Sequence, residues 1–152
     1  MKTLFGLATA ALAFASPADS AAPRPMVEHF AAPPINGTAA PFSRAVRVGD
    51  VVYLSGAIGR GPNGQPPEGI EAQTKATMDD IGATLKLAGL GYDSLFHCTA
   101  FLSDMKNWPA FNKVYVTYFP DTGRPARSAV GVNGLALGAL LEIECQAYAG
   151  KR

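Results

Sequence analysis

The residues that could do chemistry gather near the C-terminal end of the chain. Arg127 opens one short apolar run, and Glu142 and Glu144 alternate with apolar residues in the next run. Side chains on a strand alternate between the faces of a sheet, so the two glutamates are expected to share one face. A carboxylate in an apolar strand is costly to bury without a partner. Arg127 is the nearest candidate partner, and its planar guanidinium also suits a small carboxylate ligand. The sequence therefore predicts a site that holds a small acid and directs water at it.

Strands and two helices must position these side chains. β-favouring runs at residues 45–48 and 51–55 flank Gly49-Asp50, which predicts a hairpin. Apolar residues recur at steps of four and three over residues 71–88, with Gly89 beyond, and Pro109 opens a second helical pattern. Further strands are expected at residues 95–103, 126–132 and 140–149. This order predicts an α+β fold in which helices cover one face of a mixed sheet.

The other face of that sheet also needs a cover. Its expected residues are too mixed for a core and too apolar for a freely solvated surface: His97, Thr99, Phe101, Glu142 and Glu144. We therefore expect a subunit interface on this face.

The N-terminus predicts export. Lys2 precedes a short uncharged apolar run, and small residues follow at candidate cleavage positions, so residues 1–22 are interpreted as a signal peptide. The run is too short to span a bilayer. A disordered or core-packed N-terminus is the alternative. Residues 23–34 then form an extended Pro/Ala-rich leader, residues 35–152 form one domain, and the mature protein is periplasmic or secreted.

Composition excludes several partners. The net charge is +1, without a basic stripe, so neither nucleic acid nor an anionic membrane surface is expected to bind. No Cys/His spacing resembles a metal site. Cys98 and Cys145 lie in apolar runs, and free buried thiols are favoured over a disulfide, which an oxidising compartment would also permit.

The chain resembles the RidA/YjgF family of enamine/imine deaminases from residue 35 to residue 149. The resemblance rests on an ordered set of motifs: Ala40-Pro41-Phe42-Ser43, Val52-Tyr53-Leu54-Ser55-Gly56, Gln73 with Asp79-Asp80, Ala88-Gly89-Leu90, Phe111-Asn112-Lys113-Val114-Tyr115, Pro125-Ala126-Arg127-Ser128 and Glu142-Ile143-Glu144. Each motif alone is weak, and the ordered set is specific.

The resemblance implies a chorismate-mutase-like homotrimer with clefts between subunits. It implies hydrolysis of small 2-imino or enamino acids to 2-oxo acids and ammonia, with no metal or cofactor. Arg127 would hold the substrate carboxylate, and Glu144 would place the attacking water. Substrate-binding groups would be Arg127, Ser55, Gly56, Asn112 and Phe42.

Purely structural roles remain open for the same residues. Arg127 and Glu144 also fit structural ion pairs or hydrogen bonds, Asn112 fits a helix-surface role, and Glu142 is interpreted as structural. Phe42 stands where many deaminating relatives have tyrosine, so a phenolic hydroxyl is missing. This departure supports an alternative, a non-catalytic trimer that binds a small carboxylate or docks to a partner protein. An isomerase suggested by fold alone ranks below both.

Overall fold

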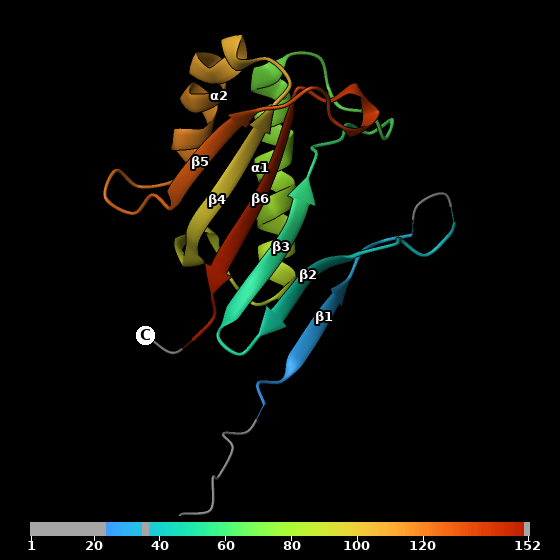
Figure 1. Ribbon diagram of the computed structural model, residues 1–152, viewed down its shortest axis with the longest axis vertical. Coiled ribbons are helices and arrows are strands. Elements are labelled where there is room, and N and C mark those ends of the chain that lie inside the picture. Colours follow the sequence, from blue (N-terminus) through green and yellow to red (C-terminus); the bar gives the residue numbers. More distant parts are fainter. Residues whose placement is uncertain (1–23, 35–36, 151–152) are drawn as a thin grey trace, which may run out of the picture.

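Six strands form one mixed sheet in the computed structural model, which describes residues 24–34 and 37–150. They are β1 (Val27–Ala31), β2 (Ser43–Val48), β3 (Val51–Ala57), β4 (Leu95–Leu102), β5 (Ala126–Gly131) and β6 (Leu141–Tyr148). Their order across the sheet is β1-β2-β3-β6-β4-β5 (Figure 1). Only β4 and β5 pair in parallel; the other neighbours are antiparallel. The predicted mixed α+β sheet is confirmed.

The predicted hairpin is β2 and β3. Val48 pairs with Val51, and Gly49 in the turn has φ 59°. This left-handed conformation suits glycine, which has no Cβ to clash with the backbone.

β1 lies inside the segment expected as an extended leader. Residues 27–31 are extended, but they pair antiparallel with β2, from Val27 opposite Val48 to Ala31 opposite Ser43. The sheet therefore begins before the expected start of the domain at residue 35. The proposed signal peptide, residues 1–22, lies outside the described residues.

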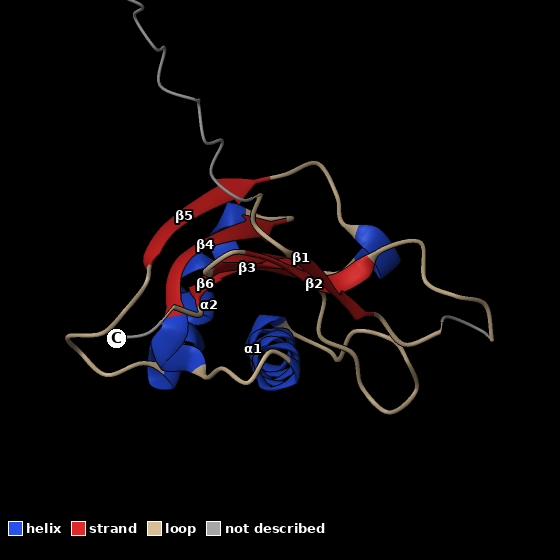
Figure 2. Cartoon of the chain, turned by 90° about the horizontal axis from the view of Figure 1, so that it is seen from below, coloured by secondary structure: helices blue, strands red, loops and turns tan. Residues whose placement is uncertain are grey.

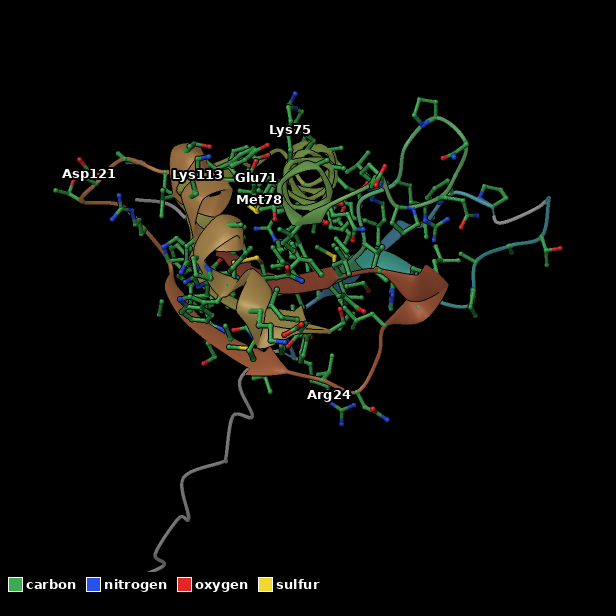
Figure 3. The ribbon with its side chains drawn as sticks, turned by 90° about the horizontal axis from the view of Figure 1, so that it is seen from above. Arg24, Glu71, Lys75, Met78, Lys113 and Asp121 are labelled. Atoms are coloured by element: carbon green, nitrogen blue, oxygen red, sulfur yellow. A yellow bond between two sulfur atoms is a disulfide. The ribbon has the colours of Figure 1, made fainter. Side chains whose placement is uncertain are left out.

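Two helices cover one face of the sheet (Figure 2). α1 spans Ile70–Leu87, and α2 spans Trp108–Tyr115. Gly89 follows α1 with φ 71° and donates its N–H to Lys86 O, as the sequence predicts for a helix C-terminus. Figure 3 shows Lys75 projecting from α1 away from the sheet. It also shows Glu71 and Lys113 between the helices, where Lys113 Nζ lies 3.2 Å from Glu71 Oε1.

The core lies between the helices and the sheet. Its fully buried side chains come from α1, α2 and the three central strands: Met78, Ile81, Leu85, Phe111, Val52, Cys98, Leu102, Leu141 and Ile143. β6 alternates as predicted, and so does β4 from His97 onward. Glu142 and Glu144 point to the uncovered face. In the described part of the chain, each helix is too short or too polar to cross a membrane.

Strict alternation over the predicted strand at residues 95–103 places Phe96 on the same face as Cys98 and Leu102, and this prediction is wrong. Phe96 is exposed, whereas Leu95 is buried. The pairing of β4 with β6 shifts register between Leu95 and His97, and this irregularity reverses the face of the first strand residues.

The cysteines form a disulfide, so the preference for free thiols is wrong. Cys98 and Cys145 are directly opposite in the antiparallel β4–β6 pair, with Cα atoms 4.1 Å apart. Both residues lie in the core. Each strand alone gives an apolar cysteine position, and only the pairing register brings the two sulfur atoms together.

Candidate active site

Arg127 lies on the helix-covered face of β5 and contacts α2. Its Nη2 donates a hydrogen bond of 2.6 Å to Asn112 Oδ1. The guanidinium carbon also lies 5.2, 4.9 and 4.4 Å from the ring centres of Trp108, Phe111 and Tyr115. These distances are in the cation–π range. The structure therefore unites two predicted site residues, Arg127 and Asn112, and adds three aromatic rings.

Electrostatics at this position favour a half-buried cation. Burial lowers the pKa of Arg127 and raises that of Tyr115 to about 12, although the charge of Arg127 opposes the second shift. Neither group changes charge near neutral pH. Arg127 carries five N–H donors, and Asn112 occupies one, so donors remain for a carboxylate.

Arg127 does not pair with either glutamate. It lies opposite Cys98 in the β4–β5 pair, and Cys98 lies opposite Cys145 in the β4–β6 pair. Paired residues share a face, so Arg127 shares the face of Cys145, and Glu144 points to the other side. The expectation that one chain places Arg127 and Glu144 in one pocket is wrong. The register between neighbouring strands decides on which face each side chain lies, and the sequence alone does not give this register.

Glu142 is the glutamate beside a predicted site residue. A Cβ at Gly56 would overlap Glu142 Oε1, so the carboxylate lies directly over the glycine backbone. The β3–β6 pairing shifts register between Leu54 and Ala57, which places Ser55 and Gly56 at an irregularity. Burial, and then the charge of Glu144, raises the pKa of Glu142. Glu144 itself is exposed.

Phe42, Ser55 and Gly56 line one cavity of about 670 Å³. It lies between α1, the ends of β2 and β3, and residues 32–34, and its volume is in the usual range for small-molecule sites. Ser55 Oγ donates to Ser43 O at 2.7 Å, so this hydroxyl stabilises the β2–β3 corner. Glu142 approaches Gly56 from the uncovered face and is not among the lining residues.

Two motif residues, Asp79 and Asp80, line this cavity. Arg44 Nη2 pairs with Asp80 Oδ1, and Arg44 Nε donates to Thr84 Oγ1 at 2.8 Å. Elsewhere Gln73 bridges Pro67 O and Leu140 N, at 2.9 and 2.8 Å, which joins two loops to α1. These residues have structural roles within the chain.

The predicted site is thus divided between the β5 edge of the sheet and the end of an interior strand, β3. Phe42, Ser55 and Gly56 lie near β3, whereas Arg127 and Asn112 lie at β5 and α2. β3 and β5 are separated by β6 and β4, and three inter-strand steps amount to about 14 Å. A small 2-imino acid cannot contact both groups of one chain.

The sequence analysis gave no catalytic or binding role to three side chains that lie close to the predicted site residues. Glu142 was interpreted as structural, although it is half-buried over Gly56. Trp108 was not singled out at all, although it faces Arg127. Tyr115 is buried, and among the described residues its hydroxyl has no hydrogen-bond partner. An aromatic repeat at steps of three and four on α2 was the available signal for the last two.

Comparisons with known proteins agree with the fold and the motifs. The family described as Endoribonuclease L-PSP matches residues 32–149. A mouse protein named 2-iminobutanoate/2-iminopropanoate deaminase is 37% identical over 112 residues, which cover 72% of this chain and 82% of the mouse protein. The chloroplastic Reactive Intermediate Deaminase A of Arabidopsis thaliana is 36% identical over 107 residues, covering 69% of this chain and 57% of that protein.

Solved structures give the same result. Yeast Mmf1 has a TM-score of 0.73 and 33% identity, with 82% of this chain and 100% of Mmf1 covered. RidA from an Antarctic Psychrobacter species has a TM-score of 0.68 and 33% identity, with 72% and 89% covered. By its matched residues, its relatives and its fold, the chain belongs to the Endoribonuclease L-PSP family, which is the RidA/YjgF family that its motifs resemble.

Proposed function

We propose that the protein hydrolyses small 2-imino or enamino acids to 2-oxo acids and ammonia in clefts between subunits. Support comes from relatives named as imine deaminases and from one observation in the structure. That observation is the division of the predicted site residues between the β5 edge and the end of β3, three strands away. In a head-to-tail ring, the β5 edge of one subunit meets the β2–β3 end of the next. The expected homotrimer is such a ring.

In this arrangement the substrate carboxylate binds Arg127 and Asn112 from one subunit. The imine carbon lies beside Ser55 and Gly56 of its neighbour. Water oxygen adds to the imine carbon, the C–N bond then breaks, and nitrogen leaves as ammonia after gaining a proton. Holding both reactants in one cleft supplies much of the acceleration.

A carboxylate near neutral pH can take a proton from water and return it to the leaving nitrogen. Glu144 is the residue that the motif comparison assigned to this role. The geometry favours Glu142, because its carboxylate lies over Gly56 and its pKa is raised. We therefore propose Glu142 as the acid–base group.

Complementation tests the shared site. We expect Arg127→Ala and Glu142→Gln to be inactive alone, with imino acid generated in the assay by an amino-acid oxidase. If the two variants are unfolded and refolded together, about one quarter of the sites, one half times one half, should carry both native groups. Activity near a quarter of the wild-type value supports the proposal. A mixture as inactive as its parents, from subunits shown to exchange, would remove it.

The competing function is a non-catalytic trimer that binds a small carboxylate. Phe42 favours it, since its exposed ring lines the cavity without the hydroxyl that many deaminating relatives carry. Saturable binding of 2-oxobutanoate without turnover of any imino acid would support this alternative. Cleavage of RNA is disfavoured, because a net charge of +1 provides little attraction for phosphates.

We also propose that the protein is exported. The apolar N-terminal run supports this, and so does the Cys98–Cys145 disulfide, since disulfides persist mainly in oxidising compartments. Fractionation of a bacterium that expresses the full chain, followed by N-terminal sequencing, tests it. A full-length protein that stays in the cytoplasmic fraction would contradict export.

A further inference from the structure

The cavity lined by Phe42, Ser55 and Gly56 is also lined by a cation, Arg60, that has no partner among the described residues. We propose that Arg60 makes this cavity a second anion subsite, so that the preferred substrates are 2-imino acids with a second, distal acidic group. The inference rests on the proposed deamination and names the substrate class of the same site.

The other charged side chains of the cavity are already neutralised. Arg44 pairs with Asp80, with 20% and 42% of the two side chains exposed. Asp79 pairs with Lys75 at 2.5 Å, and it also accepts a hydrogen bond of 2.9 Å from the Tyr118 hydroxyl. Arg60 has no ion pair or hydrogen bond to any residue that the structure describes. Among the charged lining residues, Arg60 is therefore the cation that remains available to an anionic ligand.

The backbone fixes Arg60 at this position. Gly59 N donates to Thr77 Oγ1 at 2.9 Å, and a Cβ at Gly59 would overlap the backbone of α1. On the other side, Gly61 N donates to Gln65 O at 2.8 Å and closes a tight loop. Arg60 therefore lies between two anchored glycines, and its side chain is the movable part.

The cavity has room for an extended substrate. Its volume of about 670 Å³ lies well inside the range of small-molecule sites, about 300–1,000 Å³. In the proposed ring, Arg127 of the neighbouring subunit holds the carboxylate next to the imine. The rest of the substrate then points into the cavity, towards Arg60. Hydrolysis changes only the imine carbon and nitrogen, so the distal carboxylate serves in binding and is released unchanged with the 2-oxo acid.

Stable products test the subsite without turnover. Isothermal titration compares 2-oxobutanoate with 2-oxoglutarate, which carries the distal carboxylate. An exposed ion pair contributes up to about 1 kcal/mol, so we expect wild-type protein to bind 2-oxoglutarate about five-fold more tightly. Arg60→Gln should abolish that preference, and Arg60→Lys should retain most of it. Arg24→Gln, which removes the same charge outside the cavity lining, should leave the preference unchanged.

The outcomes separate this inference from the proposed function. Equal affinities for the two acids, no binding of 2-oxoglutarate, or a preference that survives Arg60→Gln in a folded variant would each overturn the subsite. The corresponding imino acids, generated by an amino-acid oxidase, are assayed in parallel. If neither is hydrolysed faster than in buffer while the Arg60-dependent preference remains, deamination fails and the subsite stands. If both are hydrolysed and Arg60→Gln leaves their rate ratio unchanged, deamination stands and the subsite fails.

Discussion

Glu142 lies directly over Gly56, across the irregular pairing of β3 with β6. Any side chain at position 56 would occupy the space of the Glu142 carboxylate, since even a Cβ overlaps Oε1. The absence of a side chain at Gly56 therefore positions a half-buried acid beside the proposed reaction site.

We predict that Gly56→Ala removes most of the deaminase activity and leaves the fold intact. The displaced carboxylate can rotate towards the uncovered face, so the protein accommodates the methyl group by moving Glu142. Loss of an acid–base group typically reduces the rate by about 10²–10⁴-fold. Steady-state rates and a melting curve measure the two effects. Gly64→Ala offers a control at a glycine with no neighbouring atom within 4 Å, although its positive φ makes that variant slightly strained. A fully active Gly56→Ala protein would contradict the proposed role of Glu142.

We predict that Glu142→Gln increases stability at neutral pH. Burial and the charge of Glu144 raise the pKa of Glu142, so the folded state favours its protonated form. Its contribution to stability is full below the pKa of an unfolded glutamate and is lost as pH rises through the higher folded value. The neutral amide avoids that loss. The stability gain of the variant should therefore be present at pH 7 and vanish below the pKa of a free glutamate.

Denaturant titrations at several pH values measure this gain. Glu144→Gln is the matched control, because it removes the neighbouring charge while Glu142 remains. Glu144→Gln should give a smaller stability gain than Glu142→Gln, because burial raises the pKa of Glu142 more than the charge of Glu144 does. If the stability gain of Glu142→Gln is the same at every pH, it comes from packing and the prediction is wrong.

The sequence predicts most elements of the fold because each has a local signature. The period of α1, the turn at Gly49 and the alternation of β6 need only residues that are close in the chain. β1 has no comparable signature, because the prolines and alanines that flank it resemble those of a leader, and its order comes from pairing with β2.

The site is harder to predict because it depends on relations between distant strands. Motifs select Arg127, Asn112, Ser55 and Gly56. The structure shows a contact within the first pair and a common cavity for the second. They do not tell which face each strand presents. A one-residue change of register moves every side chain of a strand to the other face. The placement of Arg127 and Glu144 on opposite faces therefore could not be predicted from the motifs.

We predict that Tyr115→Phe stabilises the protein. The Tyr115 hydroxyl is buried and has no hydrogen-bond partner among the described residues, and leaving such a group unpaired costs about 1–3 kcal/mol. Phenylalanine keeps the ring against Phe111, Phe119 and Arg127. Thermal unfolding should show a melting temperature higher by roughly 3–10 °C. A lower melting temperature would mean that the hydroxyl has a partner in the assembled protein, such as a neighbouring subunit.

We predict that the disulfide is structural. It joins residues 47 apart in sequence and lies in the core, and closure of a loop of that length stabilises a domain by about 4 kcal/mol in the chain-entropy treatment. The Cys98→Ala/Cys145→Ala variant should lose about 2–4 kcal/mol in denaturant titrations and keep its site geometry. Reductant should act on the native protein only as fast as it unfolds. Rapid thiol labelling after mild reduction, without loss of structure, would contradict a protected bond.

We predict that the aromatic rings around Arg127 strengthen substrate binding. Trp108 is half-buried and its ring centre lies 5.2 Å from the guanidinium carbon, so it restrains the cation that faces the substrate carboxylate. A cation–π contact at a partly exposed position contributes about 0.5–1 kcal/mol, which corresponds to a two- to five-fold change. Trp108→Leu should raise KM by that factor with kcat nearly unchanged, because carboxylate binding contributes equally to ground and transition states. Trp108→Phe keeps a ring and should retain most of the affinity. If both variants lower kcat and leave KM unchanged, Trp108 acts on the chemical step, and the positioning role is wrong.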